Sequence, residues 1–194
     1  MWTSFVGFMG SGKSTLTRLL QDSTRRPVVS LDDEVERRVG LSIPEIFQTR
    51  GEPRFREHEL EALAGLDPER SLVVDTGGGI VQTPAACALL RQRGVVLWLD
   101  VSWDVLRRRL KAEDSGQRPL VDRLGWSGLE ALFRQRRPLY AAAADFRLRG
   151  DDVAPRDLAR TAMLRSLLWE RRNESRGPAR NDSPDTDQNN EGRR

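Results

Sequence analysis

The chain has 194 residues, with one cysteine, one histidine and a formal net charge of +3. A single cysteine excludes an internal disulfide, and the absence of a cysteine–histidine cluster argues against a zinc site. No run of about 18 apolar residues occurs, so no transmembrane helix is predicted. The first motif begins at residue 7, which leaves no room for a cleavable leader. We therefore expect a cytoplasmic protein with one folded domain over residues 1–172.

The first segment with recognisable chemistry is GFMGSGKS, residues 7–14. It fits G-x-x-x-x-G-K-[ST], in which backbone N–H groups surround a phosphate and the lysine reaches the terminal phosphates. Of the 32 basic residues only Lys13 and Lys111 are lysines, so a chance match is rare. An apolar strand over residues 2–8 and a helix over residues 14–20 are predicted to flank the loop. The motif predicts a nucleotide site formed by Gly10, Ser11, Gly12, Lys13, Ser14 and Thr15.

Four further short apolar runs follow in chain order. They cover residues 27–31, 71–75, 94–100 and 145–148, and segments with apolar residues at helical spacing lie between them. With residues 2–8 they predict an α/β fold, in which a five-stranded parallel sheet carries helices on both faces. Ligands in such folds bind at the carboxyl ends of the strands, so the residues that follow each strand are the candidate site.

Three acidic residues, Asp32, Asp33 and Glu34, follow the second predicted strand. A carboxylate at this place could orient a hydroxyl nucleophile and accept its proton. Acidic residues are also favoured in the first turn of a helix, and we assign Asp33 and Glu34 to that role. Asp32, the first after the strand, is the functional candidate.

A helix is predicted over residues 52–66, and it places Arg56 and Glu59 on one face. An arginine held in this way can bind a carboxylate with two hydrogen bonds, although such pairs are commonly surface salt bridges. His58, the only histidine, points elsewhere on the helix and is assigned a structural role.

Two further segments suggest contact with a ligand. Three glycines, Gly77, Gly78 and Gly79, follow the third strand, where backbone could pass close to a ligand or simply form a loop. Residues 111–123 are polar and contain Gly116 and Pro119, which suits either a mobile lid or an ordinary surface loop.

The remaining charge pattern concerns partners. Arginines alternate with acidic residues, as in DDEVERR and REHELEA, which is typical of solvated helix faces. We expect no nucleic-acid or membrane partner, and a monomer. Residues 173–194 are polar without apolar periodicity and are predicted to be disordered.

The order and spacing of these motifs resemble the shikimate kinase family. GFMGSGKST, LDDEVERRVG, IFQTRGEPRFREHE, DTGGGIV, QRPLV and RRPLYAAAADF carry the resemblance, from about residue 5 to about residue 153. The resemblance implies a P-loop, nucleoside-monophosphate-kinase-like fold. It also implies transfer of the γ-phosphate of ATP to the 3-hydroxyl of shikimate, on the route to aromatic amino acids, with one Mg²⁺ per subunit.

The resemblance also implies roles for single residues. Lys13 would bind the phosphates, and Ser14 would give a hydroxyl ligand to Mg²⁺. Asp32 would bind shikimate near its acceptor hydroxyls. Arg56 would bind the shikimate carboxylate with support from Glu59. The backbone of Gly77, Gly78 and Gly79 would border the substrate.

Three more arginines receive roles by the same resemblance. Arg136 would be the second arginine on the shikimate carboxylate. Arg118 would be the lid arginine that covers the phosphates, and it joins Lys13 and Asp32 in the implied catalytic set. Arg109 would lie near the adenine.

One departure from the family pattern concerns the metal. The family usually has Asp-x-Asp after the second strand, whereas this chain has Ser30-Leu31-Asp32. Asp75, at the end of the third strand, could replace the missing carboxylate through a water-mediated contact with Mg²⁺, or could cap the glycine turn. Two alternative functions stay open at this point: another small-molecule kinase of the gluconate type, and a non-catalytic nucleotide-binding relative.

Overall fold

The computed structural model describes residues 1–112 and 119–174. Five parallel strands form one sheet in the order β2-β3-β1-β4-β5. The α/β fold and all five predicted strands are confirmed, and the strand ends differ from the prediction by only one or two residues. The strands are β1 (Trp2–Val6), β2 (Val28–Ser30), β3 (Leu72–Asp75), β4 (Gly94–Asp100) and β5 (Phe146–Arg149).

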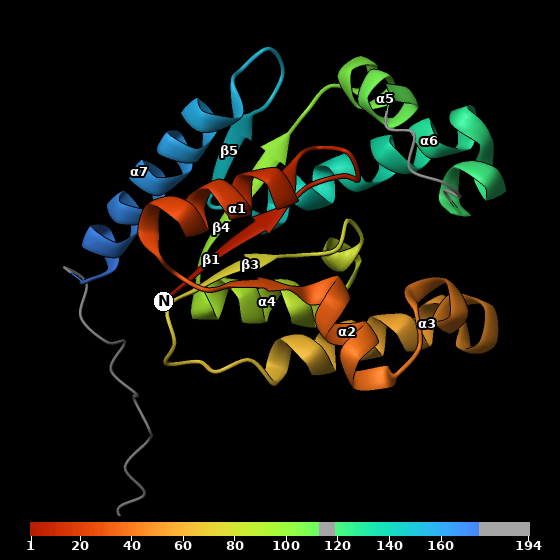
Figure 1. The fold of residues 1–194 in the computed structure, drawn as a ribbon, viewed down its shortest axis with the longest axis horizontal. Coiled ribbons are helices and arrows are strands. Elements are labelled where there is room, and N and C mark those ends of the chain that lie inside the picture. Colours follow the sequence, from red (N-terminus) through yellow and green to blue (C-terminus); the bar gives the residue numbers. More distant parts are fainter. Residues whose placement is uncertain (113–118, 175–194) are drawn as a thin grey trace, which may run out of the picture.

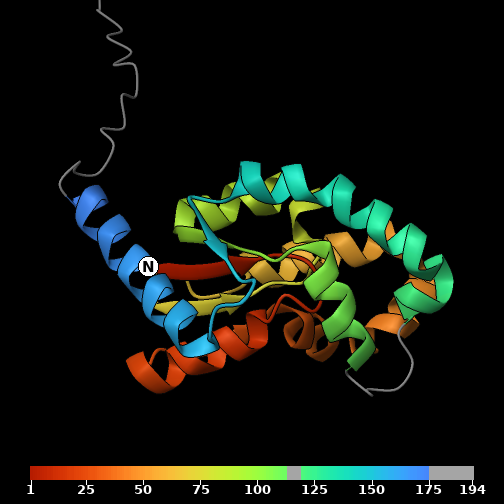
Figure 2. The same cartoon turned by 90° about the horizontal axis from the view of Figure 1, so that it is seen from above.

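Helices cover both faces of this sheet (Figures 1 and 2). One face carries α1 (Lys13–Thr24) and α7 (Pro155–Glu174), and the other carries α4 (Pro84–Arg93) and α6 (Pro119–Ala143). Beyond these layers lie α2 (Leu31–Val39), α3 (Ile43–Ala64), the short 3₁₀ helix η1 (Ile80–Gln82) and α5 (Trp103–Ala112).

The core explains why the strands could be predicted. Every residue of β1 and β4 is buried, because helices cover the two central strands from both sides. A strand buried on both faces is a continuous apolar run rather than an alternating one. β4 has this character from Val95 to Leu99, whereas β1 also buries two polar residues, Thr3 and Ser4. The carboxyl ends of both strands carry the loops of the candidate site.

Two long helices contain a kink at a glycine. α3 bends at Gly51 (φ 77°, ψ 171°) and α6 at Gly125 (φ 64°, ψ 176°), both in the left-handed region that favours glycine. The helix predicted over residues 52–66 is therefore the second segment of α3. Its first segment begins with a capping box in which Ser42 and Glu45 bond to each other's backbone.

Two predicted segments lie only partly within the described residues. The ends of the expected lid are helical, since α5 continues through Ala112 and α6 begins at Pro119; residues 113–118 lie outside the described part. α7 includes Asn173 and Glu174, the first two residues of the predicted tail, and the rest of that tail also lies outside it. Within residues 1–112 and 119–174, no helix has the length and apolar character needed to cross a membrane.

Candidate active site

The phosphate-binding motif forms a tight loop between β1 and α1. Gly12 precedes the helix with φ 98°, a conformation that glycine adopts without strain. Lys13 is the first residue of α1, and its Nζ donates hydrogen bonds to the carbonyl oxygens of Gly7 (3.0 Å) and Phe8 (3.4 Å). The free N–H groups at the start of a helix favour an anion, so this loop is built to hold phosphate.

The charge on Lys13 is balanced by two carboxylates. Burial lowers the pKa of Lys13, whereas Asp75 and, to a smaller extent, Asp32 raise it. Asp32 lies on the first turn of α2 and Asp75 at the end of β3, so two strand ends direct negative charge to one lysine. This is the charge arrangement expected where a cation and phosphates meet carboxylates.

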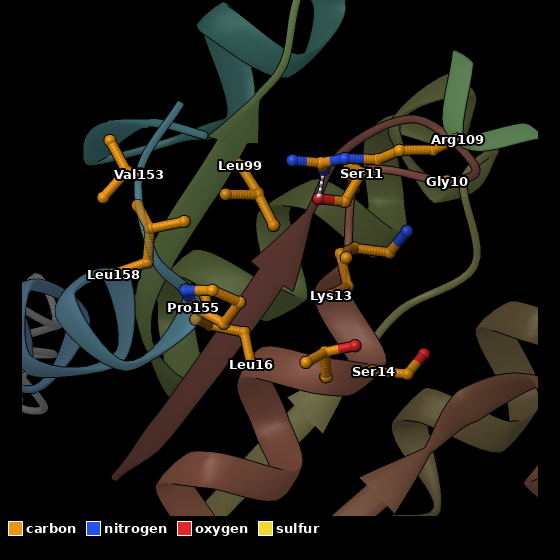
Figure 3. Close-up of a pocket in the computed structure, with 12 residues that line it drawn as sticks. Gly10, Ser11, Lys13, Ser14, Leu16, Leu99, Arg109, Val153, Pro155 and Leu158 are labelled. Carbon is orange, nitrogen blue, oxygen red and sulfur yellow. Dashed lines mark hydrogen bonds between the residues drawn. The ribbon is translucent and has the colours of Figure 1, made fainter. Parts of the chain in front are cut away.

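A pocket of about 440 Å³ opens beside the phosphate loop. Figure 3 shows Lys13 and Ser14 on one side of it, and Val153, Pro155 and Leu158 on the other. Gly10, Ser11, Gly12 and Thr15 also line it, so the pocket includes every residue that the motif assigned to the nucleotide. A volume of this size, apolar at one end and polar at the other, suits a small organic ligand with phosphates.

Arg109 forms one wall of this pocket. Its guanidinium donates to the carbonyl oxygens of Ser11 (2.9 Å) and Gly150 (3.0 Å), which fixes its plane across the opening. The apolar wall opposite, with Val153, Pro155 and Leu158, was missed in the sequence. Its only signal was an apolar position soon after the fifth strand, since no motif marks these residues.

The glycine segment after β3 is in contact with three charged side chains. A Cβ atom added at Gly77 would lie 2.6 Å from Asp32 Oδ1 and 2.8 Å from Glu59 Oε1. One added at Gly79 would lie 2.2 Å from Arg56 Nη2. Only glycine leaves room for these polar groups beside the backbone, so the segment is more than a connecting loop.

Arg56 and Glu59 form a largely buried pair. Arg56 donates to Glu59 and, at 2.8 Å, to Glu52, while the Glu59 side chain is fully buried. Burial raises the pKa of the Glu59 carboxyl, and Arg56 opposes that shift. The pair is therefore not a surface salt bridge, and Glu59 fixes the arginine next to the glycine segment.

Arg136 reaches the same glycines from α6. It is 6 % exposed, and its Nη1 donates a hydrogen bond to the Gly78 carbonyl oxygen at 3.3 Å. The same oxygen accepts a hydrogen bond from the Tyr140 hydroxyl. Burial lowers the pKa of Arg136, and nearby Arg56 lowers it further. Among the described residues, the buried Nε atoms of both arginines have no hydrogen-bond partner. Two close guanidinium groups with unused donors favour an anionic ligand.

Asp32 lies between the phosphate loop and these arginines. Burial raises the pKa of its carboxyl, whereas Lys13 lowers it. Asp33 and Glu34 follow on the same helical turn, and Glu34 forms exposed ion pairs with Arg37 and Arg38, as expected for a solvated helix start. A half-buried carboxylate beside a lysine is the arrangement that can receive a proton.

The position that lacks the family's first carboxylate has a structural role of its own. Ser30 is the N-cap of α2, and its hydroxyl accepts a hydrogen bond from the Asp33 N–H at 3.2 Å. Ser30 and Asp75 are register partners in β2 and β3, so Asp75 lies beside the place of the missing acid. Within the described part of the chain, the Asp75 carboxylate accepts no hydrogen bond, so no bond supports the turn-capping alternative.

Two further predicted residues remain. His58 is nearly buried, and its ring nitrogens lie 3.4 Å from Arg50 Nη1 and 3.1 Å from Glu61 Oε2, which fits the structural role assigned to it. Arg118, the expected lid arginine, lies outside the described residues. No three histidine, cysteine or acidic side chains group as metal ligands in the ranges that the structure covers.

Comparison with known proteins agrees with this geometry. A sequence model of the shikimate kinase family matches residues 9–166. The shikimate kinase of Aquifex aeolicus (strain VF5) is 37% identical over 159 residues, which cover 82% of this chain and 92% of that protein. That of Synechococcus sp. (strain RCC307) is 44% identical over 155 residues, 79% of this chain and 78% of that protein.

Solved structures give the same result. A shikimate kinase from Acinetobacter baumannii in complex with shikimate superposes with a TM-score of 0.76 at 34% identity, covering 86% of this chain and 92% of that chain. A gluconokinase from Sinorhizobium meliloti 1021 reaches a TM-score of 0.58 at 15% identity over 89% of this chain and 95% of that one, which shows a shared fold alone. Both the sequence and the arrangement of its site place this chain in the shikimate kinase family.

Proposed function

We propose that this protein transfers the γ-phosphate of ATP to the 3-hydroxyl of shikimate. The observation that carries the proposal is the meeting of Arg56, Arg136 and Asp32 at the Gly77–Gly79 segment, next to Lys13. Two arginines can bind one carboxylate, and a carboxylate stands where an acceptor hydroxyl would meet the phosphates.

ATP would bind in the pocket beside the phosphate loop. Its phosphates would lie against residues 10–15, with Lys13 reaching the terminal groups. The adenine would lie between the Arg109 guanidinium and the apolar wall that contains Pro155, since a planar cation stacks well on an aromatic ring.

Shikimate would bind over the glycine segment. The unused donors of Arg56 and Arg136 would bind its carboxylate, which orients the ring and carries its hydroxyls toward Asp32. The raised pKa of Asp32 makes it a better proton acceptor than an exposed aspartate, because proton transfer improves as the base pKa approaches the working pH.

Transfer itself requires little covalent chemistry from the protein. Lys13 would stabilise the charge on the transferring phosphoryl group, and Arg118 from the expected lid, residues 111–123, would add a second positive charge. Closure of a lid would exclude water, which competes with shikimate for the phosphoryl group.

The residues present fit a Mg²⁺ ion held mainly by phosphate oxygens. Mg²⁺ keeps several waters and is anchored by one or two protein groups, which agrees with the lack of a larger ligand cluster in the described residues. Ser14, at the exposed start of α1, would supply a hydroxyl ligand, and Asp75 would hold a bound water in place of the acid missing at Ser30. When bound, Mg²⁺ would neutralise charge between the β- and γ-phosphates.

A coupled assay of ADP release tests the acceptor. We expect ATP- and Mg²⁺-dependent turnover with shikimate, and only background rates with gluconate or without acceptor. Faster turnover with gluconate would assign the site to a different small-molecule kinase. Nucleotide binding without turnover on either acceptor would support a non-catalytic role. We expect a monomer that acts in the cytoplasm, where ATP is available, and sedimentation analysis checks the first point.

A further inference from the structure

A second pocket, of about 470 Å³, lies at the end of β4 and β5 next to α6. Four arginines line it, Arg134, Arg137, Arg147 and Arg149, and we refer to it as the arginine groove. We propose that the arginine groove binds a small organic phosphate monoester, separately from the nucleotide and shikimate sites.

Two of the arginines are fixed by one buried carboxylate. Asp100, 6 % exposed at the end of β4, accepts hydrogen bonds from Arg147 Nε at 2.6 Å and from Arg137 Nη2 at 3.3 Å and Nε at 3.5 Å, and it also pairs with Arg147 Nη2. Each guanidinium has five N–H donors, and this carboxylate contacts two nitrogens, Nε and Nη2, of each. The remaining donors stay available to a ligand.

The same two guanidinium groups also contact one aromatic ring. Arg137 lies 5.8 Å and Arg147 5.3 Å from the centre of the Trp98 ring. Cation–π contacts of this kind, added to the bonds with Asp100, hold both side chains at the groove. A pre-positioned guanidinium loses less side-chain entropy on binding an anion than a mobile one.

The other two arginines leave positive charge uncompensated. Within residues 1–112 and 119–174, Arg149 forms no ion pair and Arg134 pairs only with Glu130, at 2.6 Å. The other charged residues that line the groove are Asp100 and Asp151, which leaves a surplus of two positive charges. Glu130, outside the groove, lowers that surplus to one.

The shape of an arginine side chain decides which anion is favoured. Its planar fork matches the oxygens of phosphate with two parallel hydrogen bonds, and several forks in one groove suit a dianion. Trp103 and Phe133 also line the groove, with ring centres 5.8 Å apart, and provide apolar surface for the organic part of the ligand. A phosphate monoester supplies both features.

The groove is distinct from the sites described above. It shares no lining residue with the nucleotide pocket, and neither Arg56 nor Arg136 lines it. Although Arg136 and Arg137 are neighbours on α6, the first bonds to Gly78 and the second to Asp100. The helix therefore presents arginines to two different pockets.

Calorimetric titration with phenyl phosphate tests the proposal. The full chain is first saturated with a non-hydrolysable ATP analogue and shikimate, so that the other anion sites are filled. We expect one saturable site, and tighter binding of phenyl phosphate than of inorganic phosphate. The Arg134→Ala, Arg149→Ala double variant should bind at least about tenfold more weakly, because two charged hydrogen-bond partners are lost.

The matched control is the Arg18→Ala, Arg70→Ala double variant, which removes the same charge from exposed positions elsewhere. It should bind like the parent protein. Equal weakening in both double variants would mean general attraction to a basic surface and would overturn the site. Absence of saturable heat up to about 10 mM phenyl phosphate would also overturn it. Equal affinity for phosphate and phenyl phosphate would refute the contact with Trp103 and Phe133. Unchanged ADP release and melting temperature show that the variants are folded.

Discussion

Replacement of Arg136 by lysine keeps the charge but removes the planar fork. In the structure Arg136 is buried, one of its nitrogens bonds to Gly78, and its Nε is without a partner in the described residues. Lysine can replace at most one of the two bonds that the fork would give to the shikimate carboxylate. A hydrogen bond to a charged group contributes about 1.5–3 kcal/mol, so we expect the KM for shikimate to rise about 10- to 100-fold.

Burial adds a second effect that depends on pH. A lysine in this place would also be desolvated beside Arg56, and both influences lower the pKa of an amine. The defect of Arg136→Lys should therefore increase as the pH rises, because the neutral amine cannot bind a carboxylate ionically.

Steady-state kinetics with each substrate varied in turn measure these effects. The KM for ATP should stay within about twofold of the parent value, because the substitution removes a contact with shikimate and none with ATP. Arg134→Lys, on the same helix but exposed and paired with Glu130, is the control and should leave both constants unchanged. A parallel rise of both KM values would place Arg136 on the nucleotide side. An unchanged KM for shikimate would remove it from the site altogether.

Four further predictions follow from the same geometry. Lys13→Ala should lower turnover by about 10³ or more, because a fixed charge on the phosphoryl group is lost; more than a tenth of parental activity would refute the assignment. Asp75→Asn should raise the Mg²⁺ concentration needed for half-maximal nucleotide binding several-fold, and an unchanged equilibrium titration would exclude Asp75 from the metal site. Gly79→Ala should weaken shikimate binding measured by calorimetry with a small change in melting temperature, since the new Cβ meets the end of the Arg56 side chain; unchanged affinity would contradict the contact. The kcat/KM for shikimate should fall as the pH drops through the raised pKa of Asp32, because only the ionised carboxylate accepts a proton. A fall centred at pH 3.8, the ordinary pKa of an aspartate, or below would argue against Asp32 as the base.

The parts of the fold that could be predicted from the sequence are those set by local pattern. β4 is a nearly continuous apolar run, β1 is mostly apolar, and the phosphate loop has a spacing in which every fixed position has a physical reason. Arg56 and Glu59 could be placed on one helical face by the same reasoning. The burial of their ion pair could not be predicted from the sequence. It depends on the kink at Gly51 and on the contact with the Gly77–Gly79 segment, and both are features of the tertiary structure.

The features missed in the sequence are assembled from distant segments. The apolar wall of the nucleotide pocket uses single residues such as Val153 and Leu158 that belong to no motif. The arginine groove joins two arginines of α6 with two of β5 around an aspartate of β4. In a chain so rich in arginine, these positions are indistinguishable from solvated charge until the sheet brings them together.

The segment after β5 touches both pockets. The Gly150 N–H donates a hydrogen bond to the Asp100 carbonyl oxygen at 2.8 Å. The Gly150 carbonyl oxygen accepts one from Arg109, which forms a wall of the nucleotide pocket. Arg149 and Asp151 on either side line the arginine groove, and Val153 and Pro155 line the nucleotide pocket. A ligand that binds in one pocket and shifts this segment changes the affinity of the other pocket for its ligand. Thermodynamic linkage makes this effect reciprocal. Any factor by which a groove ligand changes the affinity for ATP must equal the factor by which ATP changes the affinity of the groove.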